Sequence, residues 1–174
     1  MNATHRYRIG LIYGIIGALI YAVLLFFRYT RFATDPVSFG GFASISFIVM
    51  LIFFFIAARA RKKQLGDYAP FREIFQSVLL TILITEVGYA IFNLVYLHYI
   101  NPGFFTNFKE TTRALLVKGG MEKEKIDAQL TTFDNIDKQY SIANIAKGLG
   151  MWVLIDSIFG VIYASVLKKT KPDQ

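Results

Sequence analysis

The sequence predicts an all-α, polytopic membrane protein with four transmembrane helices and an amphipathic helical hairpin between the third and fourth. Of its 174 residues, 55% are hydrophobic, and the mean hydropathy of +0.45 is high for a soluble protein. The apolar residues fall into four blocks, each close to the ~20 residues that a helix needs to cross a bilayer. Lysine and arginine gather at the ends of these blocks. Residues 1–174 are therefore predicted to form a single membrane domain in a lipid bilayer.

The first apolar block covers residues 9–27 and is flanked by Arg8 and Arg28. A cleaved signal peptide is the alternative to a transmembrane helix. The block is longer than the ~7 to 15 apolar residues of a signal peptide, and no A-x-A cleavage pattern follows it. We predict a helix that stays in the mature protein.

The second block covers residues 39–58 and follows a short polar turn that contains Asp35 and Pro36. It ends in a run of basic residues: Arg59, Arg61, Lys62 and Lys63. Such a run anchors the topology of a membrane helix, and it can also bind anionic lipid headgroups. The sequence leaves both roles open.

The third transmembrane helix is predicted over residues 77–97. Pro70 suits the first turn of a helix, so the helix is expected to begin before it enters the membrane. The fourth block covers residues 148–167 and is followed by Lys168 and Lys169.

The connection over residues 98–147 is the only long polar one. Apolar side chains recur at helical spacing in its first half until Gly119 and Gly120, namely Phe105, Phe108, Leu115 and Leu116. Its second half repeats the pattern with Ile126, Leu130 and Phe133. We predict two amphipathic helices that pack on the end of the bundle or lie in the headgroup layer.

The distribution of positive charge predicts that both termini are cytoplasmic. The N-terminus, the Arg59–Arg72 segment and the C-terminal tail carry two, five and three lysines or arginines. In the 98–147 connection, seven positive charges are nearly balanced by six negative ones. The positive-inside rule then places the connection on the outer side of the membrane.

Several short motifs resemble those of a bacterial membrane family. They are the Phe71-to-Phe75 entry into the third helix, the stretch Asn93-Leu-Val-Tyr96, its continuation Tyr99-Ile-Asn-Pro-Gly-Phe-Phe105, and the Gly119-Gly120-Met121 turn. Over nearly the whole chain, the pattern resembles the family catalogued as domain of unknown function 4199. Members usually have aspartate where this chain has Asn101. The resemblance implies a protein of the bacterial inner membrane with no assigned role, and it transfers no catalytic residue.

Two carboxylates, Glu86 and Asp156, lie inside apolar blocks. A charged side chain costs roughly 2.5 to 3.5 kcal/mol at the bilayer centre, so each needs a partner. Helix geometry puts them about 13.5 and 16.5 Å from the cytoplasmic ends of their helices, which allows one shared layer. A close pair in low dielectric would share a proton. The pair could be a proton or ion site, a hydrogen-bonded link between helices that includes Tyr21, Tyr89 or Tyr163, or, less simply, a catalytic pair.

Small polar residues line the third helix around Glu86. Ser77, Thr81, Thr85, Tyr89 and Asn93 follow one another at intervals of four residues, so they form a row that winds partly round the helix. A row of this kind can pack against another membrane helix or line a wet path. Thr85, Tyr89 and Asn93 are therefore further candidates for an ion site.

Small residues also form faces on two other predicted helices. The first helix carries Gly10, Gly14 and Gly17, and the fourth carries Gly160 and Ala164. Such spacing lets two helices approach closely, within one chain or in a homo-oligomer.

The remaining sequence features exclude several function classes. There is no cysteine, and His5 and His98 stand apart without a metal-binding spacing, so neither a metal site nor a cofactor is expected. The basic residues flank membrane blocks instead of forming a nucleic-acid stripe. No motif of a soluble-type enzyme is present.

Two functional hypotheses remain. The first is a structural or accessory subunit that contacts a membrane protein partner through residues 98–147. The second is a small proton-coupled transporter or channel component that uses Glu86 and Asp156.

Overall fold

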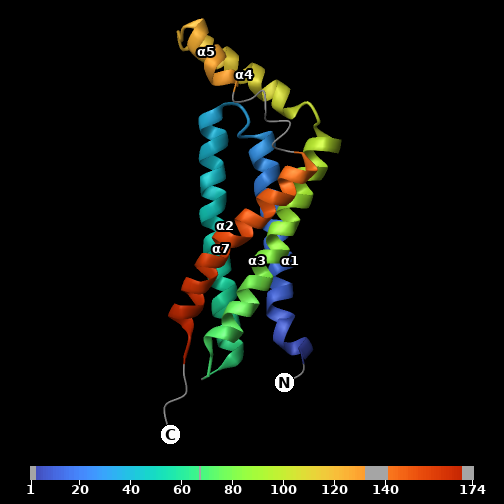
Figure 1. Cartoon of the computed structure of the whole chain (residues 1–174), viewed down its shortest axis with the longest axis vertical. Coiled ribbons are helices and arrows are strands. Elements are labelled where there is room, and N and C mark those ends of the chain that lie inside the picture. The colour runs from blue at the N-terminus through green and yellow to red at the C-terminus, as the bar shows by residue number, and fades with distance from the viewer. Residues whose placement is uncertain (1–2, 67, 132–140, 170–174) are drawn as a thin grey trace.

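The chain folds as a bundle of four long helices with a helical hairpin across one end (Figure 1). The computed structural model describes residues 3–66, 68–131 and 141–169. Its long helices are α1 (Ala3–Thr30), α2 (Pro36–Leu65), α3 (Phe71–Val95) and α7 (Ile142–Leu167). The shorter ones are α4 (Phe104–Lys118) and α5 (Lys123–Leu130), and a π-helical turn, η1 (Tyr96–Ile100), follows α3.

The predicted fold class is confirmed. The described residues contain helices and no strand, with only one isolated backbone pairing, between Ala69 and Lys169. All four long helices have the length and apolar composition needed to cross a membrane. The chain is a multi-pass membrane protein.

The helices alternate in direction, so α1 and α3 run parallel to each other and antiparallel to α2 and α7 (Figure 1). The start of α1 and the end of α7 lie at one end of the bundle, which we call the terminal end. Helices α4 and α5 lie at the other, the hairpin end. Helix α3 packs against each of α1, α2 and α7, and its contact with α1 is the most extensive.

Helix α2 is longer than the predicted 39–58 segment at both ends. It begins at Pro36 because the side chain of Asp35 accepts a hydrogen bond from the Ser38 N–H at 2.8 Å and caps the helix. It continues through the basic run to Leu65 and is followed by Gly66, whose φ of 74° few other residues adopt readily. The basic residues are therefore part of α2, and their side chains project from different faces of the helix.

Helix α7 starts at Ile142, earlier than the predicted residue 148. The segment from Ile142 to Ala146 contains two isoleucines and two alanines, and Ser141 is a suitable residue to precede a helix. The hairpin connection is correspondingly shorter.

The hairpin packs on the end of the bundle through α4. The Phe104 and Phe108 rings are buried, with ring centres 5.8 and 4.9 Å from that of Phe39 on α2. Helix α4 gives way to a turn at Gly119 and Gly120, as predicted, and α5 then projects beyond the bundle (Figure 1). Phe133 lies outside the described residues.

Two buried apolar clusters fill the bundle, one towards each end. The terminal-end cluster is built on Met50, Phe54, Ile74, Val78 and Ile82. The hairpin-end cluster contains Leu25, Tyr29, Tyr96, Leu97, Phe104 and Phe108. Between Ile82 and Tyr96, the residues that α3 buries are Thr85, Glu86, Ala90 and Asn93, and three of these four are polar. The bundle therefore has a polar layer between two apolar ones.

Candidate functional site

The two intramembrane carboxyl groups meet in the polar layer. Glu86 on α3 and Asp156 on α7 are only 2% and 3% exposed. Their carboxyl groups lie close enough together to interact electrostatically. The structure thus brings together the two residues that helix geometry allowed to share one layer.

The packing of α3 on α7 explains why they meet. Val78 and Ile82 of α3 lie against Gly160 of α7, at 3.4 and 3.5 Å from where a Cβ atom on that glycine would stand. The helices run antiparallel, so one turn further along α3 corresponds to one turn back along α7. That step leads from Ile82 to Glu86 and from Gly160 to Asp156.

The pair can hold a proton. Two buried carboxyl groups that lie close together can share a hydrogen bond only when at least one of them carries a proton. Oδ1 of Asp156 is buried and has no hydrogen-bond partner among the described residues. One acceptor position of the pair is therefore left over for a proton, an ion or a water molecule.

Tyrosines border the pair on one side. Tyr21 of α1 lies close enough to interact electrostatically with both Glu86 and Asp156. Its ring packs on that of Tyr89, with ring centres 4.7 Å apart. Tyr163 instead donates a hydrogen bond from its hydroxyl to the Leu51 carbonyl oxygen on α2, at 3.1 Å.

The polar row of α3 forms its seam with α1. The hydroxyl of Thr85 donates to the Gly14 carbonyl oxygen at 3.3 Å, and that of Thr81 lies 3.4 Å from the Gly10 carbonyl oxygen. At the end of the row nearest the hairpin, the Tyr29 hydroxyl donates a hydrogen bond to Oδ1 of Asn93. Through these contacts, the polar row of α3 packs against α1, whereas Glu86 faces α7.

The α1 glycines make this close packing possible. A Cβ atom on Gly10 would lie 2.8 Å from the Ser77 carbonyl oxygen, and one on Gly14 would lie 2.7 Å from Cβ of Ile84. On Gly17 it would meet the hydroxyl of Thr85. On α7, Gly160 lies against α3, and Ala164 belongs to the terminal-end cluster.

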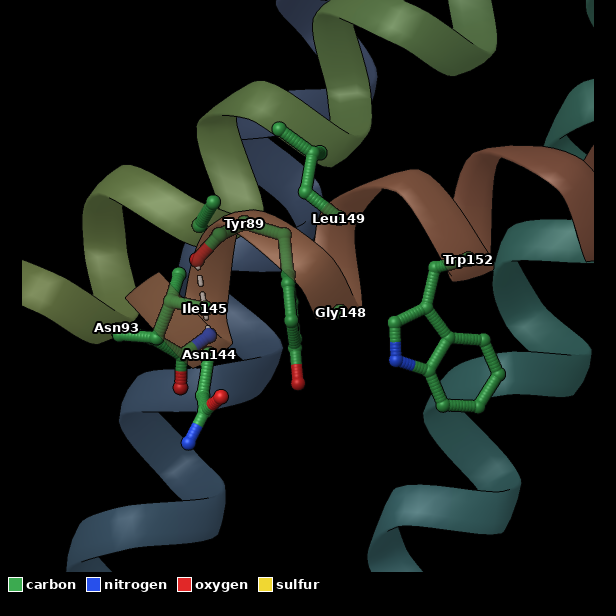
Figure 2. Close-up of a pocket in the computed structure, with 8 residues that line it drawn as sticks. Tyr89, Asn93, Asn144, Ile145, Gly148, Leu149 and Trp152 are labelled. Atoms are coloured by element: carbon green, nitrogen blue, oxygen red, sulfur yellow. Dashed lines mark hydrogen bonds between the residues drawn. The ribbon is translucent and has the colours of Figure 1, made fainter. Parts of the chain in front are cut away.

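Two cavities lie between the polar layer and the hairpin end. One, of about 190 Å³, is bounded by Tyr89, Asn93, Asn144, Gly148 and Trp152 (Figure 2). The other, of about 280 Å³, reaches from Tyr21 to Arg28. Tyr89 and Trp152 line both cavities, so these two side chains stand between them.

Sequence reasoning missed Trp152. Its position four residues before Asp156 puts both on one face of α7, and that spacing was the available signal. Gly88 was also missed. A Cβ atom there would lie 2.5 Å from Cβ of Ala18, so Gly88 extends the α1–α3 seam.

The basic run of α2 separates into two groups. Arg61 is buried and forms an ion pair with Glu73 at 2.7 Å, next to a hydrogen bond of 2.6 Å to Gln64. Arg59, Lys62 and Lys63 instead line a cavity of about 650 Å³ at the terminal end. Only these three are placed to meet a ligand or a lipid.

Metal ligation has no support within the described part of the chain, where no three His, Asp or Glu side chains gather closely enough to hold an ion.

The model of one protein family, described as protein of unknown function (DUF4199), matches residues 8–169. The chain belongs to this family. The resemblance seen in the sequence motifs is thus confirmed, and the match includes all the residues of the carboxyl pair, the α1–α3 seam and the basic run. Neither the curated proteins nor the solved structures contain a match to this DUF4199 chain. The function proposed for it therefore rests on its own residues.

Proposed function

We propose that this DUF4199 protein is a small proton-coupled transporter or channel component in which Glu86 and Asp156 bind the coupling proton. The observation that carries the proposal is the contact between two buried carboxyl groups on different membrane helices. Intramembrane acids are rare, and they commonly mark proton or ion pathways. A purely structural link between helices would need only one acid with a neutral partner.

Protonation of the pair would change how α3 and α7 fit together. With one shared proton the carboxyl groups attract each other, and with none they carry two like charges in a low-dielectric layer. Losing the proton therefore favours either separation of the helices or binding of a compensating cation. A protein that binds its substrate differently in these two states couples proton and substrate movement.

The cavities support access from the hairpin end. Tyr21 interacts with both carboxyl groups and also lines the 280 Å³ cavity, whose far wall includes Arg28. A proton could pass between the cavity and the pair along the Tyr21 hydroxyl. The terminal-end apolar cluster lies on the other side of the pair and would close that direction in this conformation.

Proton flux into liposomes tests the proposal. The wild type and the Glu86→Gln, Asp156→Asn double variant would be reconstituted in parallel, and lumenal pH followed under an imposed gradient. We expect proton flux in the wild type and its loss in the double variant. Because the substitutions are near-isosteric, size-exclusion profiles and thermal unfolding should show that the variant is folded.

The matched control is a Glu110→Gln, Glu124→Gln double variant, which likewise replaces two carboxyl groups by amides, but on exposed acids of the hairpin. It should keep wild-type flux. Equal flux in the folded Glu86→Gln, Asp156→Asn protein would rule out the carboxyl pair as the proton site.

We also propose that the protein lies in the bacterial inner membrane with both termini and the α2–α3 connection in the cytoplasm. The excess of lysine and arginine at the terminal end supports this orientation. An alkaline phosphatase fusion after Lys118 should be active and one after Lys63 inactive. The reverse pattern would overturn the orientation.

A structural or accessory role is the second candidate. It is supported by the projection of α5 beyond the bundle and by Leu115 and Val117, which are 40% and 60% exposed on α4. A membrane protein partner or a second copy of the chain could cover them. Against it, Phe104, Phe108 and Leu130 are already buried within this chain. Loss of association on Leu115→Ser, with flux unaffected by the carboxyl variants, would favour this role.

A further inference from the structure

The terminal half of α2 has two faces of different character. Met50, Phe54, Ala57, Ala58 and Arg61 follow one another at helical spacing and are all buried. The opposite face carries Ile52 and Ile56, which are 57% and 47% exposed, and then Arg59 and Lys63. Along this outward face, an apolar stretch that faces lipid leads directly into a basic one.

A cavity lies at the boundary between the two stretches. It measures about 650 Å³, which is within the range of ~300 to 1,000 Å³ common for ligand sites. Its basic lining is Arg59, Lys62 and Lys63, and its apolar lining includes Ile56, Tyr13 of α1 and Leu167 of α7. Three helices therefore contribute to it.

Within the described residues, no acidic side chain forms an ion pair that neutralises the positive charge of this cavity. Arg59, Lys62 and Lys63 form no ion pair with any acidic side chain in the part of the chain that the structure describes. Arg61, one position away, is buried and paired with Glu73. The basic residues of α2 are thus divided between an internal structural pair and an open, positively charged site.

We propose that this cavity binds one anionic phospholipid. The phosphate would lie among Arg59, Lys62 and Lys63, and an acyl chain would run along Ile56 and Ile52. Guanidinium and ammonium groups are the usual protein partners of phosphate. The position of the apolar stretch on the membrane side of the basic one matches the order of headgroup and chain in a lipid. This inference is independent of the proton site, which lies in the polar layer.

Native mass spectrometry of the full chain tests the site. The protein would be released from vesicles of phosphatidylcholine with a fifth of phosphatidylglycerol, and retained lipid counted. We expect one phosphatidylglycerol to be retained in preference to phosphatidylcholine. Retention should fall roughly fivefold for each charge removed by Arg59→Gln, Lys62→Gln or Lys63→Gln.

The matched control is a Lys118→Gln, Lys123→Gln, Lys125→Gln triple variant, which removes three charges from exposed positions at the hairpin end. It should retain phosphatidylglycerol as the wild type does. Equal loss in this control, or unchanged retention in the Arg59→Gln, Lys62→Gln, Lys63→Gln triple variant, would overturn the proposal. The single variants Arg59→Gln and Lys63→Gln keep the test decisive if the triple variant does not fold, since both side chains are exposed.

Soluble glycerol 3-phosphate distinguishes a lipid from a free phosphate compound. Thermal unfolding in a neutral detergent would be followed with either phosphatidylglycerol or glycerol 3-phosphate at equal concentration. The proposal expects stabilisation by the lipid and little by the soluble compound, because only the lipid fills the apolar part of the cavity. Equal stabilisation by both would overturn the assignment to a lipid.

Discussion

At the scale of single residues, the partners of buried polar side chains decide what each one does. The Thr85 hydroxyl donates a hydrogen bond to a carbonyl oxygen of α1 and so helps to hold two helices together. Glu86, the next residue, faces α7 and meets a second acid. Neighbouring positions on α3 therefore face different helices, because successive residues point about 100° apart around a helix.

Replacing Gly10 by alanine should weaken the α1–α3 seam. The new Cβ atom would lie 2.8 Å from the Ser77 carbonyl oxygen, which cannot move freely, so we expect a loss of about 1 to 3 kcal/mol in the free energy of unfolding. Unfolding in detergent micelles measures it. Gly150→Ala is the control, because its Cβ atom would meet nothing within 4 Å, and it should be neutral or stabilising. Equal effects of the two substitutions would contradict the seam.

Replacing Arg61 by glutamine should destabilise the protein much more than the same change at Lys63. Arg61 is 1% exposed and paired with Glu73, and breaking a buried pair on one side costs about 3 kcal/mol. Lys63 is exposed, so its replacement should cost less than about 0.5 kcal/mol. Chemical unfolding of both variants measures the difference, and similar midpoints would show that the buried pair contributes little.

At the scale of helices and connections, the ends of each element explain how the bundle is held. Asp35 caps α2, and the backbone of Ala69 pairs with that of Lys169, which ties the α2–α3 connection to the chain after α7. The aromatic residues of α4 close the hairpin end. All three contacts therefore lie at the ends of helices or in the connections between them.

The cap on α2 should give the protein a pH-dependent contribution to stability. Hydrogen bonds from the side chain and backbone of Ser38 lower the pKa of Asp35 below its ordinary value of 3.8. A carboxyl group whose pKa falls on folding stabilises the folded state above its ordinary pKa, and this contribution is lost as the pH falls through the folded-state pKa.

Asp35→Ala should therefore lower the unfolding temperature at pH 7, with a difference from the wild type that shrinks under acidic conditions. Asp35→Asn is the control, since asparagine also caps helices but does not titrate. It should keep most of the stability and lose the pH-dependent part. A difference between Asp35→Ala and wild type that stays constant into strong acid would contradict the role of the ionised cap.

Truncating Phe108 should loosen the hairpin from the bundle. Its ring packs on Phe39 and Phe104, so Phe108→Ala should expose α4 and α5 to faster cleavage by trypsin. Leu115→Ala, at an exposed position of the same helix, should leave the cleavage rate close to that of the wild type. Equal rates for Phe108→Ala and wild type would show that other contacts hold the hairpin.

At the scale of the whole molecule, the sequence predicted the number of membrane helices and the hairpin because both follow from local hydrophobic periodicity. It also identified Glu86 and Asp156, since a charged residue in an apolar block is conspicuous. It did not predict that α7 begins at Ile142, that Arg61 differs from its neighbours, or that the polar row faces α1. Those facts depend on which helix packs on which face, and helical periodicity alone does not determine that choice.

Infrared spectroscopy of the reconstituted protein can detect a proton on the carboxyl pair, because a protonated carboxylic acid has a characteristic carbonyl stretch. At neutral pH the wild type should show this band if, as proposed, Glu86 and Asp156 hold a shared proton within the membrane. The Glu86→Gln, Asp156→Asn variant should lack it, while the Glu110→Gln, Glu124→Gln control keeps it. A wild-type spectrum without the band, or one unchanged in the Glu86→Gln, Asp156→Asn variant, would contradict a proton bound by this pair.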